Sequence, residues 1–156
     1  MPSAPEFEIQ PDALFDVTIT TDKGDIVMRL DASLAPVTVN NFVVNARKGF
    51  YDGLTFHRVV PEFVIQGGDP EGTGRGGPGY KFADEPVKAE YTLGAVAMAN
   101  AGPDTNGSQF FICIDDCRSK LQPLYNLFGH VTSGIEVAQS IGVGDVMRTV
   151  TVADPA

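Results

Sequence analysis

Glycine and proline divide this chain into short segments, and that division limits the folds it can adopt. The 156 residues include 17 Gly and 11 Pro. Both residues are unfavourable inside helices and strands, and both are favoured in turns. We therefore expect many short elements joined by turns rather than a few long ones. The length fits one domain that can bury a core of ordinary size.

One segment has the apolar spacing of a helix. Its apolar residues recur three and four positions apart and are Val39, Phe42, Val43 and Ala46. Pro36 suits the first turn, the basic residues Arg47 and Lys48 suit the last turn, and Gly49 suits the stop. The pattern predicts a helix from about residue 36 to residue 48.

Runs of β-branched and aromatic residues predict strands in most of the remaining chain. Two runs, 15–21 and 24–30, are separated only by Asp22 and Lys23, which indicates a hairpin. Further strands are expected at 55–60, 63–66, 93–98, 109–114, 127–131 and 146–152. A second helix is expected to start at Ser133, because Ser133 and Glu136 have capping-box spacing. The pattern predicts a mainly β fold, a closed antiparallel barrel with helices outside it or at its ends.

Composition and charge narrow the classes of function. The formal net charge of −9 argues against nucleic-acid or anionic-membrane partners, which require clustered Lys and Arg. No apolar run reaches the length of a membrane span, and residues 1–6 do not resemble a signal peptide. Residues 1–13 are rich in proline and acid, and we interpret them as a loose leader before a domain at 14–156. A cytoplasmic monomer is expected.

The cysteines and histidines give little support for metal or redox chemistry. Cys113 and Cys117 are too few for a disulfide framework or a structural zinc site. Cys113 lies in an apolar run and should be buried, whereas Cys117 lies among polar residues and should be exposed. His57 is interpreted as a core or supporting residue and His130 as a surface residue. No metal or cofactor is expected.

A glycine-rich string at 72–77 matches the dinucleotide-binding pattern G-x-G-x-x-G. That pattern binds a pyrophosphate only when a helix follows it directly. Here Pro78 and Gly79 follow, and neither continues a helix. We therefore interpret 67–79 as a long loop, a class of segment that is often functional.

Two segments, 56–69 and 98–112, place polar side chains beside aromatic ones. Val64 and Gln66 should share one strand face, as should Gln109 and Phe111. Arg58 lies among apolar residues and would be costly to bury fully, so it should line a cleft. The alternative is that its aliphatic stem merely covers apolar surface. Because His57 and Arg58 are adjacent in a strand, at most one of them should face a given side.

These segments resemble the cyclophilin family of peptidyl-prolyl isomerases, whose members also bind cyclosporin. The matching strings are F-H-R-V-x-x-x-F-x-x-Q-G-G-D at 56–69 and M-A-N-A-x-x-x-x-N-G-S-Q-F-F-I at 98–112. The similarity extends to Phe128 and Gly129 and covers about residues 15–152. It implies a closed eight-stranded antiparallel β-barrel capped by two α-helices, with the site on the outer face. It also implies proline-containing peptides and flexible or unfolded protein segments as partners.

The resemblance assigns roles by position. It makes Arg58 the main catalytic residue with Gln66 beside it. Gln66 and Asn100 would hold the peptide backbone, with Ala99 next to them, and Gln109 would position the arginine or the peptide. The proline ring would be held by Phe63, Val64, Phe111 and Leu121, with Tyr125 on the pocket wall.

The chain departs from the family pattern at the rim of this site. Val64 stands where many members have Met, and Tyr125 stands where they have His. The chain contains no Trp, and Lys120 or Leu121 falls near the place where many members carry one. Weak cyclosporin binding is therefore expected. Two other hypotheses remain, a module that binds proline segments without turnover and a purely structural interaction domain.

Overall fold

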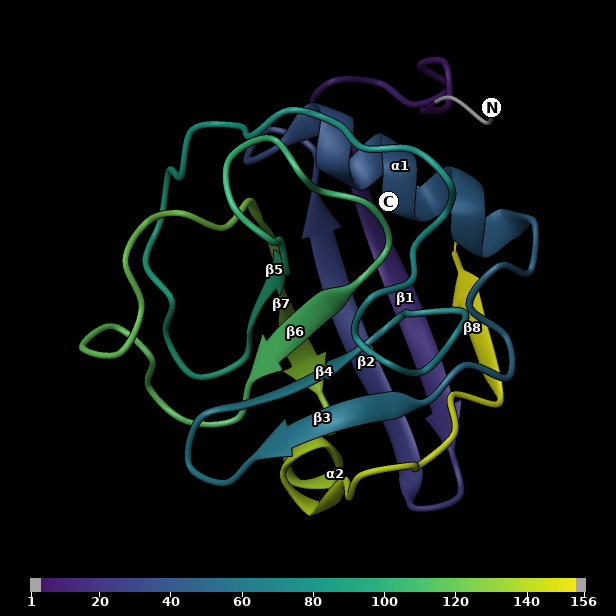
Figure 1. Ribbon diagram of the computed structural model, residues 1–156, viewed down its shortest axis with the longest axis vertical. Coiled ribbons are helices and arrows are strands. Elements are labelled where there is room, and N and C mark those ends of the chain that lie inside the picture. Colours follow the sequence, from purple (N-terminus) through teal and green to yellow (C-terminus); the bar gives the residue numbers. More distant parts are fainter. Residues whose placement is uncertain (1–3, 154–156) are drawn as a thin grey trace.

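A strongly curled antiparallel sheet forms the body of the protein, with α1 across one end and α2 at the other (Figure 1). The computed structural model describes residues 4–153. Within that range the elements are β1 (Leu14–Thr21), β2 (Gly24–Asp31), α1 (Pro36–Arg47), β3 (Phe56–Val60), β4 (Val64–Gly67), β5 (Ala95–Met98), β6 (Phe110–Cys113), β7 (Leu127–Ser133), α2 (Ile135–Ser140) and β8 (Thr149–Val152). The predicted set of antiparallel strands and two helices is confirmed.

The eight strands found within residues 4–153 follow the order β3-β4-β6-β5-β7-β2-β1-β8. Among these residues no ladder joins the edge strands β3 and β8, so the sheet is a curled half-barrel rather than the closed barrel predicted. The gap is spanned where the start of β3 and the residues before it meet the segment that precedes β8. Phe56 N donates to Asp145 O at 2.9 Å, and Met147 N donates to Leu54 O at 2.8 Å.

The main core fills the space between the curled sheet and α1. Strands β1 and β2 alternate between buried and partly exposed residues, as expected when one face covers a core. From α1, the Phe42 ring stacks on Tyr51 at 4.6 Å and meets Phe110 edge-on at 5.3 Å between ring centroids. By contrast, β5 and β6 are buried on both faces, because a second apolar cluster covers their outer side. That second cluster forms the base of the candidate site.

The prediction that Ser133 caps the second helix is wrong. Ser133 is the last residue of β7 and pairs with Val27, so its backbone belongs to the sheet. Gly134 precedes α2 with a positive φ of 81°. A methyl group on Gly134 would lie 2.1 Å from the carbonyl oxygen of Asp25. The close approach of β2 therefore requires glycine at this turn.

The prediction that Cys117 is exposed is also wrong. Its backbone N–H donates to Tyr91 O at 2.9 Å, and its Sγ lies 3.4 Å from Phe63 O. These contacts draw the residue into the second cluster, where both Cys113 and Cys117 are buried and free. The expected burial of Cys113 is confirmed.

The division between a leader and a domain near residue 13 stays a prediction, and its residues 1–3 and 154–156 lie outside the described residues. Within 4–13, Asn40 of α1 bonds the backbone at two points. Its Oδ1 accepts from Glu8 N at 2.9 Å, and its Nδ2 donates to Glu6 O at 3.0 Å. This part of the leader therefore contacts α1.

Helix α1 receives its N-terminal cap from a residue far along the chain. The Glu85 carboxylate accepts from Val37 N at 3.0 Å and from Thr38 N at 2.7 Å. Asn126 Oδ1 in turn accepts from Glu85 N at 2.8 Å, and Asn126 Nδ2 donates to Thr38 Oγ1 at 2.9 Å. The first turn of α1, the loop around residue 85 and the start of β7 are thereby tied together.

Replacing Glu85 with alanine should lower the free energy of unfolding by about 1–2 kcal/mol, because two N–H groups of the first turn lose their acceptor. Urea unfolding with an unchanged m-value would measure the loss. Glu90→Ala is the control. It removes an exposed ion pair with Arg118 and should change stability by no more than about 0.5 kcal/mol. Equal midpoints for the two variants would contradict this account of the cap.

Candidate active site

A pocket opens on the outer face of the sheet, over β3, β4 and β6. We call it the Arg58 pocket, and it is lined by His57, Arg58, Phe63, Val64, Gln66, Thr73, Gly74, Ala99, Asn100, Phe111, Leu121 and Tyr125. Its volume is about 530 Å³, within the range of small-ligand sites. Nine of the ten residues predicted for the site line it, and the tenth, Gln109, lines an adjoining pocket. The expectation that Arg58 lines a cleft is confirmed.

Strand register brings the polar and apolar parts of this pocket together. Arg58 of β3 pairs with Gln66 of β4, and Gln66 pairs with Phe111 of β6. Paired residues in an antiparallel sheet project from the same face. The three side chains therefore form a row across the sheet, although they come from distant parts of the sequence.

Hydrogen bonds fix the polar members of this row. Arg58 Nη1 donates to Gln66 Oε1 at 3.2 Å, and Gln66 Nε2 donates to Gln109 Oε1 at 3.0 Å. Gln109 Nε2 donates to the carbonyl oxygen of Gly76 at 2.9 Å. Each amide thus accepts from one side and donates to the other. The guanidinium is oriented by a neutral amide and takes part in no ion pair within residues 4–153.

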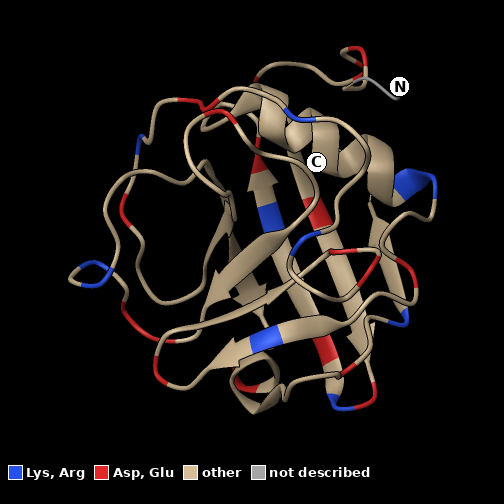
Figure 2. Cartoon of the chain, viewed as in Figure 1, with Lys and Arg blue, Asp and Glu red and all other residues tan. Residues whose placement is uncertain are grey.

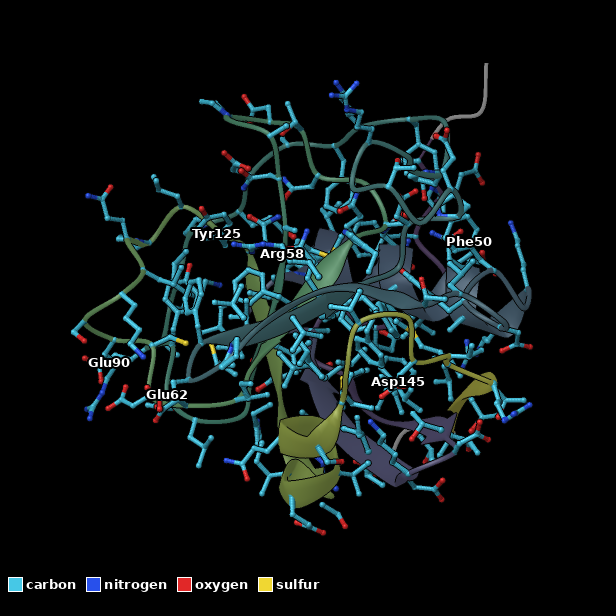
Figure 3. The ribbon with its side chains drawn as sticks, turned by 60° about the horizontal axis from the view of Figure 1, so that its bottom comes forward. Phe50, Arg58, Glu62, Glu90, Tyr125 and Asp145 are labelled. Carbon is cyan, nitrogen blue, oxygen red and sulfur yellow. The ribbon has the colours of Figure 1, made fainter. Side chains whose placement is uncertain are left out.

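The opposite wall of the pocket is aromatic and aliphatic. The Phe111 ring is almost fully buried and meets Tyr125 edge-on, with centroids 5.5 Å apart. In Figure 3, Arg58 and Tyr125 lie near one another on the same flank of the molecule. Tyr91, which sequence reasoning did not single out, donates from its hydroxyl to Tyr125 O at 2.6 Å. Burial raises the pKa of Tyr91 to about 12, so this hydroxyl keeps its proton.

The strict alternation expected for His57 and Arg58 is wrong. Both residues line the Arg58 pocket, because the pairing of β3 with β4 shifts register between Phe56 and Arg58. Such a bulge turns a side chain that would otherwise face away. Burial lowers the pKa of His57; the Asp69 carboxylate raises it by less, and the Arg58 guanidinium adds to the lowering. His130 is exposed, as predicted.

Asp69 was also missed as a site-supporting residue. Its carboxylate is 1% exposed and accepts four backbone N–H bonds, from Glu71 at 2.8 Å, Thr73 at 2.9 Å, Gly74 at 2.6 Å and Gly76 at 3.1 Å. Burial alone would raise the pKa of this carboxyl, but these bonds outweigh burial and hold it below its ordinary value of 3.8. The loop is therefore wrapped around a buried charge.

Gly76 joins this loop to the row of amides. Its N–H donates to Asp69 and its carbonyl accepts from Gln109. A methyl group on Gly76 would lie 2.0 Å from Asp69 Oδ1, so a larger residue could not approach the carboxylate in this way. The segment that resembles a nucleotide-binding string is instead the anchor of the Gln109 side chain, and no helix follows it.

The same loop forms one side of an adjoining pocket of about 710 Å³, which we call the glycine-loop pocket. It is lined by Gln66, Gly74, Arg75, Gly76, Gly77, Pro78, Gly79, Tyr80, Lys81, Ala99, Asn100, Ala101, Thr105, Gly107, Ser108 and Gln109. The two pockets share Gln66, Gly74, Ala99 and Asn100. A bound chain that fills one pocket can therefore continue over the other.

No group of three or more His, Cys, Asp or Glu among residues 4–153 could hold a metal ion. No helix in the same range has the length and apolar character needed to cross a membrane.

Comparisons with known proteins agree with the site. The family model described as cyclophilin type peptidyl-prolyl cis-trans isomerase/CLD matches residues 16–155. Peptidyl-prolyl cis-trans isomerase B of Bacillus subtilis (strain 168) is 50% identical over 133 residues, which are 84% of this chain and 92% of that protein. A peptidyl-prolyl cis-trans isomerase of Helicobacter pylori is 46% identical over 139 residues, 85% of this chain and 83% of that protein.

Solved structures show the same likeness. The cyclophilin type peptidyl-prolyl cis-trans isomerase of Cryptosporidium parvum, solved in the presence of the dipeptide Ala-Pro, superposes with a TM-score of 0.82 at 31% identity. The superposition covers 89% of this chain and 99% of that one. The fold and the site define a proline-directed isomerase of the cyclophilin class. This chain belongs to the cyclophilin-type peptidyl-prolyl cis-trans isomerase family, as its sequence predicted.

The role of Asp69 can be tested through pH. Asp69→Asn should lower the free energy of unfolding at neutral pH by about 1–3 kcal/mol, because an amide NH₂ would face backbone donors. A carboxyl with a lowered pKa stabilises the fold above its ordinary pKa of 3.8, and this contribution is lost as pH falls through the folded value. Urea unfolding should therefore show a wild-type advantage that is constant above about pH 5 and shrinks below about pH 4.

Asp12→Asn provides the control for this measurement. Asp12 is exposed and precedes the first strand, so its replacement should leave the unfolding curve nearly unchanged at each pH. If the difference in free energy of unfolding between wild type and Asp69→Asn were the same at every pH from 3 to 7, Asp69 would not act as a charged acceptor.

Proposed function

We propose that Arg58 accelerates rotation about Xaa-Pro bonds by stabilising the twisted amide, in peptides and in flexible or unfolded protein segments. One observation carries the proposal. The Arg58 guanidinium is oriented by Gln66, forms no ion pair among the described residues, and lines the same pocket as Phe111. A fixed, uncompensated donor beside an apolar wall suits a proline ring and its nitrogen.

The chemistry follows from the electronic structure of the amide. Resonance gives the C–N bond partial double-bond character and spreads the nitrogen lone pair over the carbonyl group. Twisting the bond breaks this resonance and leaves the lone pair on the prolyl nitrogen. A donor aimed at that lone pair binds the twisted state more strongly than either planar state, which lowers the barrier. Arginine is suited to this because it stays protonated and offers several N–H groups.

The required energies are of the right size. Uncatalysed isomerisation takes about 10–100 s, and ordinary turnover of about 1–10³ s⁻¹ requires lowering the barrier by about 1.4–7 kcal/mol. One preorganised donor in a partly dry site contributes about 2.7–4 kcal/mol. Restraint of the ring and of the flanking chain supplies the remainder in this proposal.

The neighbouring residues provide that restraint. We assign the proline ring to the apolar wall formed by Phe63, Val64, Phe111, Leu121 and Tyr125. Gln66, Ala99 and Asn100 would restrain the peptide backbone. The Asn100 side chain donates to Leu124 O at 2.9 Å and accepts from Gly102 N at 3.2 Å, which fixes its orientation beside the pocket.

A module that binds proline segments without turnover is the second hypothesis. The apolar wall alone would serve such a module, and a guanidinium at the position of the prolyl nitrogen would not be needed. The orientation of Arg58 by an ordered chain of amides favours catalysis over simple docking.

Arg58→Ala should reduce kcat/KM on a short Xaa-Pro peptide at least tenfold while the unfolding curve changes little, because the exposed side chain contributes to the reaction more than to the fold. A protease-coupled assay would measure the rate. Arg148→Ala, which removes an exposed arginine paired with Asp22, is the matched control and should keep the wild-type rate. Residual activity above about one tenth would remove Arg58 from the catalytic role.

Cyclosporin affinity should be lower than in family members that carry Trp at the pocket rim. Leu121 lines the Arg58 pocket, and the chain has no Trp to cover the ligand from that side. Titration calorimetry on this protein and on a Trp-containing member in the same buffer would compare the two. Equal dissociation constants would contradict the expectation.

A monomeric state and a cytoplasmic location complete the proposal. Large exposed apolar side chains are few and scattered among residues 4–153, as in proteins without an obligate interface. The two free, buried thiols are compatible with a reducing compartment.

A further inference from the structure

The two joined pockets have a charge opposite to that of the protein. The chain has 20 acidic and 11 basic residues and a net charge of −9. Figure 2 shows acidic positions on every visible side of the fold. Yet no Asp or Glu among residues 4–153 lines either pocket, and the charged residues that do are Arg58, Arg75 and Lys81. The substrate-facing surface is therefore cationic in an acidic protein.

These three cations also differ from most others in their partners. Outside the pockets, ion pairs with carboxylates are formed by Lys23, Arg29, Arg118, Lys120 and Arg148. Within residues 4–153, neither Arg58 nor Arg75 nor Lys81 forms an ion pair, and all three are exposed. Their charge is available to a bound peptide.

Carboxylates do lie on the neighbouring segments. Asp69 is buried behind the loop and its charge is met by backbone N–H groups, while Glu71 is exposed at the same loop. Asp84 and Asp104 bond to each other's backbone on adjoining segments. None of the four lines a pocket, so none occupies the surface that a peptide would cover.

We propose that Arg75 and Lys81 of the glycine-loop pocket select segments in which a carboxylate side chain lies within about three residues of the isomerised proline. The inference rests on the proposed function, since it places the proline ring in the Arg58 pocket. The pockets share Gln66 and Asn100, so a chain leaving the ring crosses directly to the glycine-loop pocket. An extended chain advances about 3.3–3.6 Å per residue, so two or three residues are enough to cross a pocket of this size.

The expected preference is moderate and depends on salt. Exposed charge pairs each contribute little, and two of them together correspond to about a fivefold change in kcat/KM. Such pairs are screened over about 10 Å at 0.1 M salt. The preference should therefore be clear at low ionic strength and should decline as salt is added.

The experiment uses matched peptides with one proline and with Glu, Gln or Lys two residues before or two residues after it. We expect kcat/KM for a Glu peptide to exceed that for the matching Lys peptide about fivefold at low salt on at least one side of the proline. Above 0.5 M salt the ratio should approach one. The inference would be overturned if the Gln peptides were turned over but kcat/KM were equal for the Glu and Lys peptides, whether the charge precedes or follows the proline. That result would leave the proposed isomerase activity standing. Absence of turnover on every peptide would overturn the proposed function instead.

The double variant R75Q/K81Q identifies the residues responsible. It should reduce the Glu-to-Lys ratio to below about twofold. K48Q is the matched control, because Lys48 is an exposed cation that lines neither pocket, and it should preserve the wild-type ratio. If K48Q lowered the ratio as much as R75Q/K81Q, the effect would belong to net charge and the assignment would be wrong. A ratio unchanged in the double variant would also overturn it.

Discussion

The row of hydrogen bonds from Arg58 through Gln66 and Gln109 to Gly76 is the interaction on which the site depends. It exists because β3, β4 and β6 are adjacent and in register, so that residues far apart in sequence meet side by side. A change of one residue in that register would turn each side chain to the other face. In the proposed mechanism, the fold contributes chiefly by fixing the direction of one guanidinium. The half-barrel places β3 at the edge of the sheet, where that guanidinium can stay exposed.

At the Gly76 end of this row, the loop is held in place by hydrogen bonds to the buried Asp69 carboxylate rather than by apolar packing. Asp69 collects backbone N–H groups from a loop whose glycines leave room for close approach. Removing a carboxylate from water is unfavourable unless several donors replace the water, and here the loop provides them. The glycine-rich sequence is thereby converted from a flexible segment into a defined one. The same bonds that stabilise the loop therefore also fix the position of the Gln109 side chain, because Gly76 bonds both Asp69 and Gln109.

Local patterns predicted the elements that depend on local interactions. The β1–β2 hairpin, α1 and the strand positions follow from turn residues, helical spacing and β-branched runs, and all are confirmed to within a few residues. The failures have nonlocal causes. Ser133 has capping-box spacing but is paired with Val27 in the sheet, and Cys117 has polar neighbours in sequence but apolar neighbours in space. The bulge that brings His57 beside Arg58, and the cap that Glu85 supplies to α1, depend on partners that no local pattern reveals. Nine of the ten residues named by the family resemblance line one pocket, because strand register is a property of the shared fold.

An arginine that acts on a neutral nitrogen must remain charged and must not be neutralised by a neighbour. A carboxylate within contact distance would keep the guanidinium charged but would compete with the substrate for its donors. A neutral amide such as Gln66 orients the fork without cancelling its charge, which is the compromise observed here. The acidic surroundings at longer range then have a favourable effect. The net negative field of the protein stabilises each unpaired cation and so offsets part of their mutual repulsion, while the carboxylates of residues 4–153 stay outside the pockets. In the proposed mechanism, the distribution of charge and the orientation of Arg58 therefore meet one requirement, which is a cation oriented by neutral groups.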